Sequence, residues 1–337
     1  MKNRIFYLDI IRILACVMIV AMHAPIPNTG LSSYVLSTDS LLAAPGVGLF
    51  VMVSGALLLP MNMPTKQFLK RRMGKILFPT LFWTLFYMFV NWFDYGFEEI
   101  DLWSVLISIP FSSQFGVILW FMYMLAGLYL LTPVISPWLK QVGKRELEFY
   151  LILWAITMCY PYIRDYVDVT EDYTGILYYF GGYAGYFLLG YYLRTYAKSW
   201  AVWKCLMLLL FPIFIAVVLK TQQITIRFYD SFWYLSLLVA MMGGSWFLLI
   251  KRMNIKYTDA SKLHYFIVLV SNCCFGIYLM HIFVMRSLIW KWSWLYDLGV
   301  IQILMVTLLT FIGSLVVTWL ISYLPGAEYI IGFKQKR

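Results

Sequence analysis

Three ionisable side chains interrupt an otherwise apolar stretch near the amino terminus of this 337-residue chain, LDIIRILACVMIVAMH. Asp9 and Arg12 are one helical turn apart, and eleven positions, close to three whole turns, separate Arg12 from His23. On one helix Arg12 and His23 would therefore lie within about 20° of each other around the axis and roughly 16 Å apart along it. Because imidazole titrates near neutrality, His23 could act as a general base on a reacting hydroxyl, with Asp9 orienting Arg12.

A structural alternative for the same stretch is an Asp9–Arg12 ion pair with His23 as an interfacial histidine. A charge at the centre of a bilayer costs roughly 2.5–3.5 kcal/mol even on the lenient insertion scale. We therefore expect the polar stripe to face the interior of the protein and to line a wet cavity.

Aromatic and polar residues at a similar expected depth could form a second part of such a site. Tyr278 and His281 end the run SNCCFGIYLMH, and Trp120 and Tyr123 lie in ILWFMY. These four side chains are candidates for the walls or polar contacts of an acceptor site. Alone, Trp120 and Tyr123 would be typical of the aromatic belt at a membrane interface.

A cluster of cations lies in KQFLKRRMGKILFP, where Arg72 and Lys75 are one turn apart and Arg71 precedes them. Guanidinium and ammonium groups so arranged could bind the phosphates of a cytoplasmic donor. The competing explanation is that these cations only mark the cytoplasmic end of a membrane helix.

The composition places all of these groups in a membrane. Of the residues, 62% are hydrophobic and 12% are charged, which is about half the charged fraction of a soluble domain. The net charge is +10, but the cations occur in short bursts between apolar runs, which favours a cytoplasmic membrane surface over nucleic acid. The five cysteines show no metal-ligand spacing, so we expect core residues and no metal site.

The apolar runs predict an all-α polytopic bundle of about ten transmembrane helices. Only short connections lie between the runs, so residues 1–337 should form a single transmembrane domain. The expected spans are 6–25, 42–60, 76–93, 117–136, 148–163, 175–193, 202–219, 231–250, 264–284 and 299–323.

The orientation follows from the distribution of lysine and arginine between alternate loops. With the amino terminus inside, 20 of the 26 cations fall on the cytoplasmic side and five outside, and Arg12 lies within the first span. Both termini are therefore expected in the cytoplasm, and the protein is expected to be a multi-pass protein of the cell membrane.

Together these residues resemble the acyltransferase-3 family of integral membrane acyltransferases over essentially the whole chain. That family's hallmark is a basic residue and a histidine separated by ten positions on the first helix, matched here by Arg12 and His23. Lys75 departs from the family pattern, in which arginine is commoner, and a lysine lacks bidentate phosphate geometry. Further matching segments are LDIIRILA, GLFVMVSGALL, RRMGKILFP, LWFMYMLAGLYLLTPVI, YFLLGYYL and FGIYLMH.

The resemblance implies a standalone O-acyltransferase that moves an acyl group, often acetyl from acetyl-CoA, to a hydroxyl of a glycan or lipid-linked saccharide outside the cytoplasm. Acetyl-CoA would be a co-substrate and not a permanently bound cofactor. Its phosphates would lie against the cations of RRMGK, and its pantetheine arm would pass Arg12 toward His23. His23 would act as the general base, and the formation of an acyl-histidine intermediate is an alternative mechanism.

Other functions would also use a polar stripe and basic inner loops. The main alternative is a transporter or flippase of an anionic or lipid-linked substrate, which paired repeats and broken helices would favour. The sequence shows neither feature. The membrane-bound O-acyltransferases, a different enzyme class that also uses acyl-CoA, lack this first-helix spacing. A purely structural membrane subunit would give no reason to bury Arg12.

Overall fold

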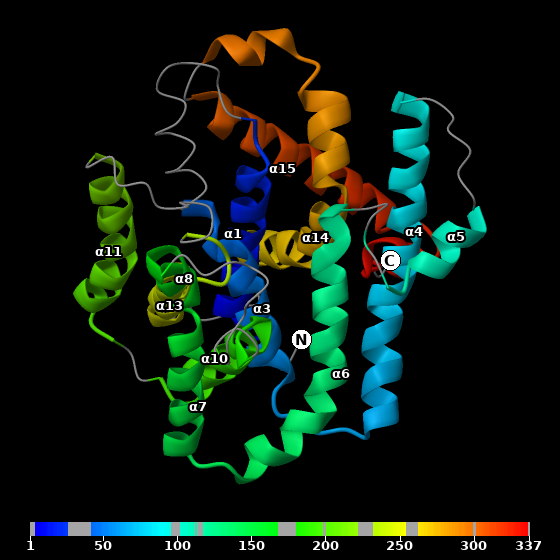
Figure 1. The fold of residues 1–337 in the computed structure, drawn as a ribbon. Helices are drawn as coiled ribbons and strands as arrows, with labels where there is room; N and C mark the ends of the chain where they lie inside the picture. Colours follow the sequence, from blue (N-terminus) through cyan, green and yellow to red (C-terminus); the bar gives the residue numbers. More distant parts are fainter. Residues whose placement is uncertain are drawn as a thin grey trace.

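The computed structural model describes residues 4–25, 42–95, 102–111, 113, 117–167, 180–197, 200–221, 232–253, 262–298 and 301–335. These segments form helices and turns, in agreement with the expected all-α class (Figure 1). The α-helices are α1 (Phe6–Met22), α3 (Pro45–Leu58), α4 (Thr65–Tyr95), α5 (Leu102–Ser108), α6 (Trp120–Gln141), α7 (Lys144–Thr157), α8 (Tyr160–Val167), α10 (Tyr183–Thr195), α11 (Val202–Thr221), α13 (Leu237–Arg252), α14 (Lys262–Phe283), α15 (Ile301–Ile321) and α16 (Ala327–Ile331).

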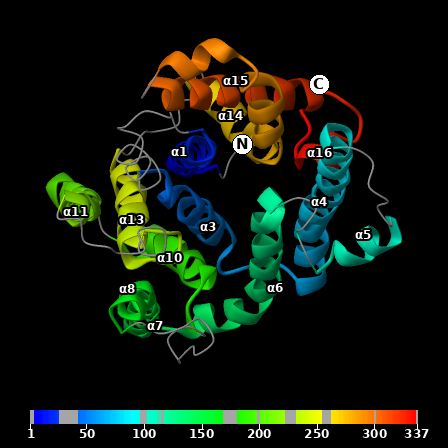
Figure 2. The ribbon, with the colours of Figure 1, turned by 45° about the horizontal axis from the view of Figure 1, so that its top comes forward.

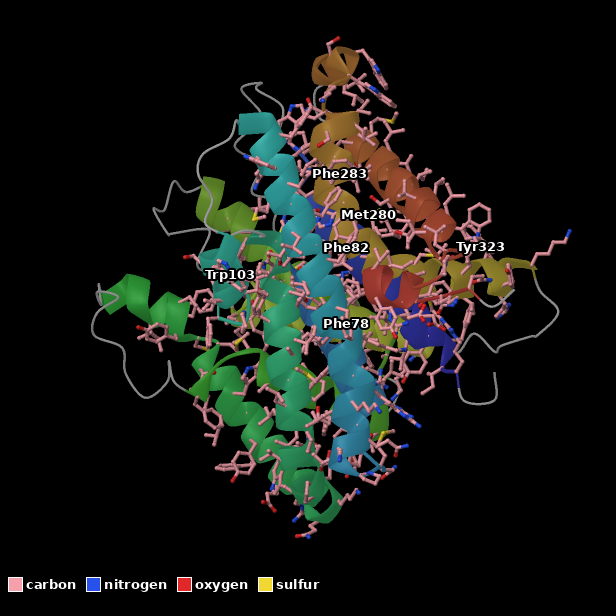
Figure 3. All side chains as sticks on the ribbon, turned by 90° about the vertical axis from the view of Figure 1, so that its right-hand side faces the viewer. Phe78, Phe82, Trp103, Met280, Phe283 and Tyr323 are labelled. Atoms are coloured by element: carbon pink, nitrogen blue, oxygen red, sulfur yellow. The ribbon has the colours of Figure 1, made fainter. Side chains whose placement is uncertain are left out.

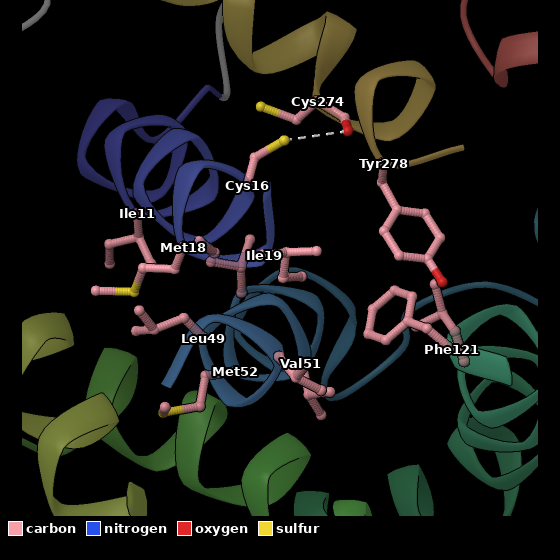
Figure 4. Close-up of a cluster of buried hydrophobic side chains, with 14 of the residues drawn as sticks. Ile11, Cys16, Met18, Ile19, Leu49, Val51, Met52, Phe121, Cys274 and Tyr278 are labelled. Atoms are coloured by element: carbon pink, nitrogen blue, oxygen red, sulfur yellow. Dashed lines mark hydrogen bonds between the residues drawn. The ribbon is translucent and has the colours of Figure 1, made fainter. Parts of the chain in front are cut away.

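Helices α1 and α3 form the centre of the bundle, as Figure 2 shows. Helix α1 packs against α3, α14, α15 and α13, and α3 also packs against α10 and α13. Figure 4 shows part of this core, where the Cys16 thiol of α1 donates to the Cys274 carbonyl of α14 at 3.6 Å. Cys16 and Cys274 are both buried and free, so they are core residues as expected.

Two glycines allow the closest helix contact in this core. A Cβ at Gly55 of α3 would collide with the Phe187 backbone of α10, and a Cβ at Gly190 of α10 would collide with the Met52 backbone of α3. Small residues let helix backbones approach closely where lipid provides no hydrophobic force between helices. The α3–α10 contact therefore depends on glycine at both positions.

Within the described residues, four helical segments are long and apolar enough to cross a membrane, and two more apolar helices are shorter. The four are Thr65–Phe93, Trp120–Gln141, Lys262–Ile289 and Ile301–Ile321, and the shorter two are Pro45–Leu58 and Val202–Val218. This supports a multi-pass membrane protein. The described helices that are long enough to cross a membrane are fewer than the ten spans expected from the sequence.

The outer surface of these helices is apolar. Phe78 and Phe82 of α4 are 51% and 40% exposed, and Figure 3 shows them on the flank of the molecule beside α14 and α15. Soluble proteins rarely expose large continuous apolar surfaces. A surface of this kind suits lipid.

Several boundaries differ from the expected ones. Helix α4 begins at Thr65, not at position 76, so the cations of RRMGK lie on its early turns and not before it. The expected span 148–163 is divided into α7 and α8, which meet near Tyr160 and Pro161. The span expected at 175–193 becomes the 13-residue α10, and residues 168–179 lie outside the described part of the chain.

Candidate active site

The polar stripe of α1 is part of a buried ionic cluster. Asp9 is only 4% exposed, and its carboxylate accepts hydrogen bonds from Arg4 Nε at 2.6 Å and Nη2 at 2.8 Å. Arg12 Nη1 lies 3.6 Å from the same carboxylate, and Ser271 of α14 donates its hydroxyl to it at 2.7 Å. Asp9 therefore holds two arginines, and its shorter bonds are to Arg4.

Arg4 reaches Asp9 because the helix begins after it. Ile5 has an extended backbone, with φ −106° and ψ 101°, and α1 starts at Phe6. The Arg4 guanidinium also donates to Asn272 Oδ1 at 3.1 Å, which ties the start of the chain to α14. One carboxylate between two guanidinium groups leaves one positive charge in excess at this end of the bundle.

Arg12 belongs to this ionic cluster and also lines a cavity. Its Nη1 donates to Ser271 Oγ at 3.1 Å, and its side chain is 27% exposed. The cavity has a volume of about 230 Å³. Its lining comes from α1, α4, α6, α14 and the carboxyl-terminal segment: Arg12, Arg72, Lys75, Ile76, Leu125, Tyr129, Asn272, Phe275, Ile331, Gly332 and Phe333.

The cavity brings together three of the cations that the sequence assigned to a donor. Arg12 of α1 and Arg72 and Lys75 of α4 all line it. Cations sharing one concave surface attract an anion, and guanidinium groups bind phosphate with directed hydrogen bonds. The volume is below the roughly 300–1,000 Å³ of pockets that enclose a drug-sized ligand. The cavity is therefore suited to a small anionic group or to one end of a larger anionic molecule.

The carboxyl-terminal segment closes one side of the cavity. Trp83 of α4 donates its indole N–H to the Ile330 carbonyl at 2.9 Å and fixes this segment to α4. Gly332 follows in the left-handed conformation, with φ +68°, and a Cβ there would meet the Phe275 ring at 2.8 Å. Both the turn and the close approach require glycine.

At the other end of α1, two histidines lie face to edge. The ring centroids of His23 and His281 are 5.0 Å apart, with an interplanar angle of 66°. His23 Nδ1 is 2.8 Å from the Ile19 carbonyl, and His281 Nδ1 is 2.6 Å from the Tyr278 carbonyl. Because a carbonyl oxygen can only accept, each Nδ1 carries a proton, and in the neutral form of each ring Nε2 is then the nitrogen with a lone pair.

Aromatic side chains connect the histidine pair with α6. Tyr278 lies 5.3 Å from Phe121 between ring centroids (Figure 4). It also lies 5.9 Å from His281, and its hydroxyl donates to the Ile118 carbonyl. Trp120 stacks on Tyr234 at 5.6 Å. The Tyr234 hydroxyl contacts the sulfur of Met22, the residue before His23, at 3.0 Å. Trp120, Tyr278 and His281 therefore belong to one aromatic cluster around His23.

Phe121 and Tyr278 stand between the two parts of the site. The cavity lining includes Leu125, one turn along α6 from Phe121, but neither histidine. Both aromatic side chains are at least nine-tenths buried. Phe121 and Tyr278 thus link the residues near the cavity to the histidine pair through ring contacts.

Two residues considered from the sequence, and the remaining histidine of the chain, lie outside these groups. Tyr123 donates its hydroxyl to the Ile109 carbonyl at 2.6 Å and so faces the segment after α5. Arg71 is exposed and is not among the cavity-lining residues. His264 is buried against the Phe6 ring, with centroids 4.3 Å apart, near the start of α14.

The sequence interpretation missed the contributions of Arg4, Ser271, Asn272 and Tyr129. Ser271 and Asn272 carried a visible signal, since they begin the same apolar run that ends at His281. Arg4 was counted only as a cytoplasmic charge, and its spacing from Asp9 does not match a helical turn. No sequence pattern indicated that the carboxyl-terminal segment lines the cavity. Among the described residues, no group of three or more His, Cys, Asp or Glu side chains could hold a metal ion.

Comparison with known proteins gives one match. A family model described as an acyltransferase domain, acyltransferase family 3, matches residues 5–323. This match includes α1, α4, α6 and α14 and excludes most of the carboxyl-terminal segment that closes the cavity. No curated protein and no solved structure matches the chain.

Proposed function

This chain belongs to the acyltransferase-3 family, and from that premise we propose that it is a membrane O-acetyltransferase using cytoplasmic acetyl-CoA. The acceptor is a hydroxyl of a glycan or lipid-linked saccharide on the extracytoplasmic side. The observation that carries the proposal is a single cavity lined by Arg12 of α1 and by Arg72 and Lys75 of α4. His23 lies at the end of α1, the helix that also carries Arg12.

The donor half of the reaction uses the positive charge of this cavity. Arg72 and Lys75 bind the phosphates of the donor, and the lysine acts as a point charge without bidentate geometry. Arg12 lies deeper and is held by Asp9 and Ser271, so its guanidinium is already oriented when the donor enters. Preorganised charge of this kind costs no reorganisation during the reaction.

The transfer half takes place at the histidine pair. The pantetheine arm extends beside Phe121 and brings the thioester to His23, a distance of roughly 16 Å along α1 from Arg12. His23 Nε2 takes the proton of the acceptor hydroxyl while the oxygen attacks the thioester carbonyl. The carbon–sulfur bond then breaks, and the imidazolium returns its proton to the leaving thiolate. The products are the O-acetyl ester and free CoA.

Two measurements test this function. Purified protein in detergent is given acetyl-CoA, and the release of free thiol is followed. In parallel, surface carbohydrates from cells with and without the gene are compared for O-acetyl groups by mass spectrometry. We expect thiol release, and O-acetyl groups that depend on the gene. A wild-type protein that neither releases thiol nor changes carbohydrate acetylation would overturn the proposal.

The same experiment distinguishes an acetyltransferase from a transporter or flippase. A protein that only moves an anionic molecule leaves acetyl-CoA intact, whatever its affinity for it. Binding of acetyl-CoA without any release of thiol would therefore favour the transport alternative.

A further inference from the structure

Buried hydroxyl groups form a row on one face of α15. Thr307, Thr310 and Ser314 follow one another at intervals of three and four residues, the spacing of one helical face. Thr310 and Ser314 are 0% exposed and Thr307 is 8% exposed. None of the three hydroxyl oxygens has a hydrogen-bond partner within the described structure.

Other buried hydroxyls on membrane helices of this protein behave differently. Thr80, Thr132 and Ser136 each donate to the carbonyl four residues earlier, at 2.7, 2.8 and 2.7 Å. This bond is the usual way for a helix to satisfy a buried hydroxyl. A buried hydroxyl without a hydrogen-bond partner destabilises the folded protein. Three successive unsatisfied groups therefore indicate a partner that the described residues do not supply.

The row lies at the level of His281. Helices α14 and α15 cross where Gly276 packs on Thr318 and Val284 packs on Gly313. In the sequence, His281 of α14 lies between Gly276 and Val284. Along α15, Ser314 lies between Gly313 and Thr318. The Nε2 atom of His281 is also buried without a partner in the described part of the chain. Thr310 and Thr307 continue the row away from this crossing.

The outer end of the row reaches the end of α1. Gln302, in the first turn of α15, donates its Nε2 to the Pro25 carbonyl at 3.4 Å, two residues beyond His23. The Gln302 Oε1 atom is a further buried oxygen without a partner among the described residues. The unsatisfied polar atoms thus extend from His281 along α15 toward the expected extracytoplasmic side.

We propose that Thr307, Thr310 and Ser314 of α15, together with His281 Nε2, bind the hydroxyl groups of the acceptor and position it at His23. Three of these groups are hydroxyls and the fourth is an imidazole nitrogen, so the ligand they suit is a polyhydroxyl molecule, a carbohydrate. Hydroxyls can both donate and accept, and the neutral His281 Nε2 accepts, which matches the hydroxyls of a sugar. This proposal rests on the proposed function, because it assigns the acceptor half of that reaction.

The proposal predicts how the unfolding temperature of the protein changes when these hydroxyls are removed. If the hydroxyls are bound only by the acceptor, the shape-conserving double substitution Thr310→Val and Ser314→Ala removes unsatisfied groups and leaves the unfolding temperature unchanged or higher. If they are bound to other protein groups, the same substitution lowers it. Thr132→Val on α6 is the matched control, since its hydroxyl is equally buried but bonded to the Leu128 carbonyl.

The test compares these variants with the wild-type protein and with His23→Ala. Unfolding temperature and hydrolysis of acetyl-CoA without acceptor are measured on purified protein, and O-acetyl groups on surface carbohydrate are measured in cells at matched expression. For Thr310→Val with Ser314→Ala, we expect carbohydrate acetylation to fall about tenfold or more, as for loss of one or two hydrogen bonds to substrate. The ratio of carbohydrate acetylation to acetyl-CoA hydrolysis should therefore fall, because water as acceptor makes no contact with the hydroxyl groups of a sugar site.

Two outcomes would overturn the proposal. One is normal carbohydrate acetylation in the double variant, and the other is a lower unfolding temperature with hydrolysis and acetylation reduced in parallel. If His23→Ala abolishes acetylation in the same experiment, the failure concerns the α15 row alone. If the wild-type protein acetylates no carbohydrate, the proposed function itself fails.

Discussion

His23 and His281 come from opposite ends of the sequence, and their ring centroids lie 5.0 Å apart. Each ring donates Nδ1–H to a carbonyl of its own helix, Ile19 for His23 and Tyr278 for His281. The backbone thus fixes both rings in the state in which Nε2 is the free base. We propose this pair of imidazoles, held at the end of α1, as the place where the acetyl group is transferred.

The first prediction concerns His23. His23→Ala removes the proton acceptor, and we expect acetyl transfer to fall by at least about 10²-fold, the usual contribution of a general base. The chromatographic profile in detergent should not change, because His23 is only half-buried. Thiol release from acetyl-CoA is the measurement. His264→Ala is the matched control, since His264 lies at the other end of α14 and should keep its activity; a well-folded His23→Ala protein that transfers normally would exclude the base role.

The second prediction compares two of the cations that line the cavity, Arg12 and Lys75. Arg12→Ala should raise the KM for acetyl-CoA more than Lys75→Ala does, because Arg12 is oriented by Asp9 and Ser271 while Lys75 is exposed. Loss of a charge-assisted hydrogen bond of about 1.5–3 kcal/mol corresponds to a KM increase of roughly tenfold or more. Steady-state kinetics on purified protein provide the values.

Arg71 supplies the control for that series. It neighbours Arg72 in sequence but does not line the cavity, so Arg71→Ala should leave the KM for acetyl-CoA within roughly twofold of wild type. Equal KM values for the Arg12 and Lys75 variants would contradict the assignment of Arg12 to the inner part of the donor path.

The third prediction concerns the buried carboxylate. Arg4→Ala removes two hydrogen bonds from Asp9, which is 4% exposed, and leaves it with Ser271 and the more distant Arg12. We expect a destabilisation of about 1–3 kcal/mol and a clear decrease in unfolding temperature. Arg4→Lys should recover only part of it, because lysine cannot form the bidentate contact. An unchanged unfolding temperature in Arg4→Ala would show that the ion pair contributes nothing to the fold.

The fourth prediction tests the contact between α3 and α10. Gly55→Ala places a Cβ against the Phe187 backbone, which cannot move without separating the two helices, and should destabilise by about 2 kcal/mol or more. Gly127→Ala on α6 is the control, because its Cβ would meet no atom within 4 Å. That substitution should be neutral or should stabilise by about 0.5–1 kcal/mol, since alanine favours a helix. Thermal unfolding followed by size-exclusion chromatography distinguishes the two.

Much of this protein follows from its sequence through local geometry. The apolar runs gave the helical membrane class, and the spacing of Arg12 and His23 placed both on one face of a helix, because helix periodicity depends only on position along the chain. The boundaries were less well predicted. Helix α4 begins at Thr65 because helix propensity continues through the cations, whereas an apolar run can only show where lipid begins.

The tertiary structure alone decided which residues meet. Asp9 bonds most closely to Arg4, the donor cavity is closed by Gly332 and its neighbours, and His281 packs on His23. These contacts join segments far apart in the chain, and their formation depends on how helices cross and on which glycines let them approach. A sequence specifies the face of each helix, but only the packed bundle determines which faces lie opposite one another.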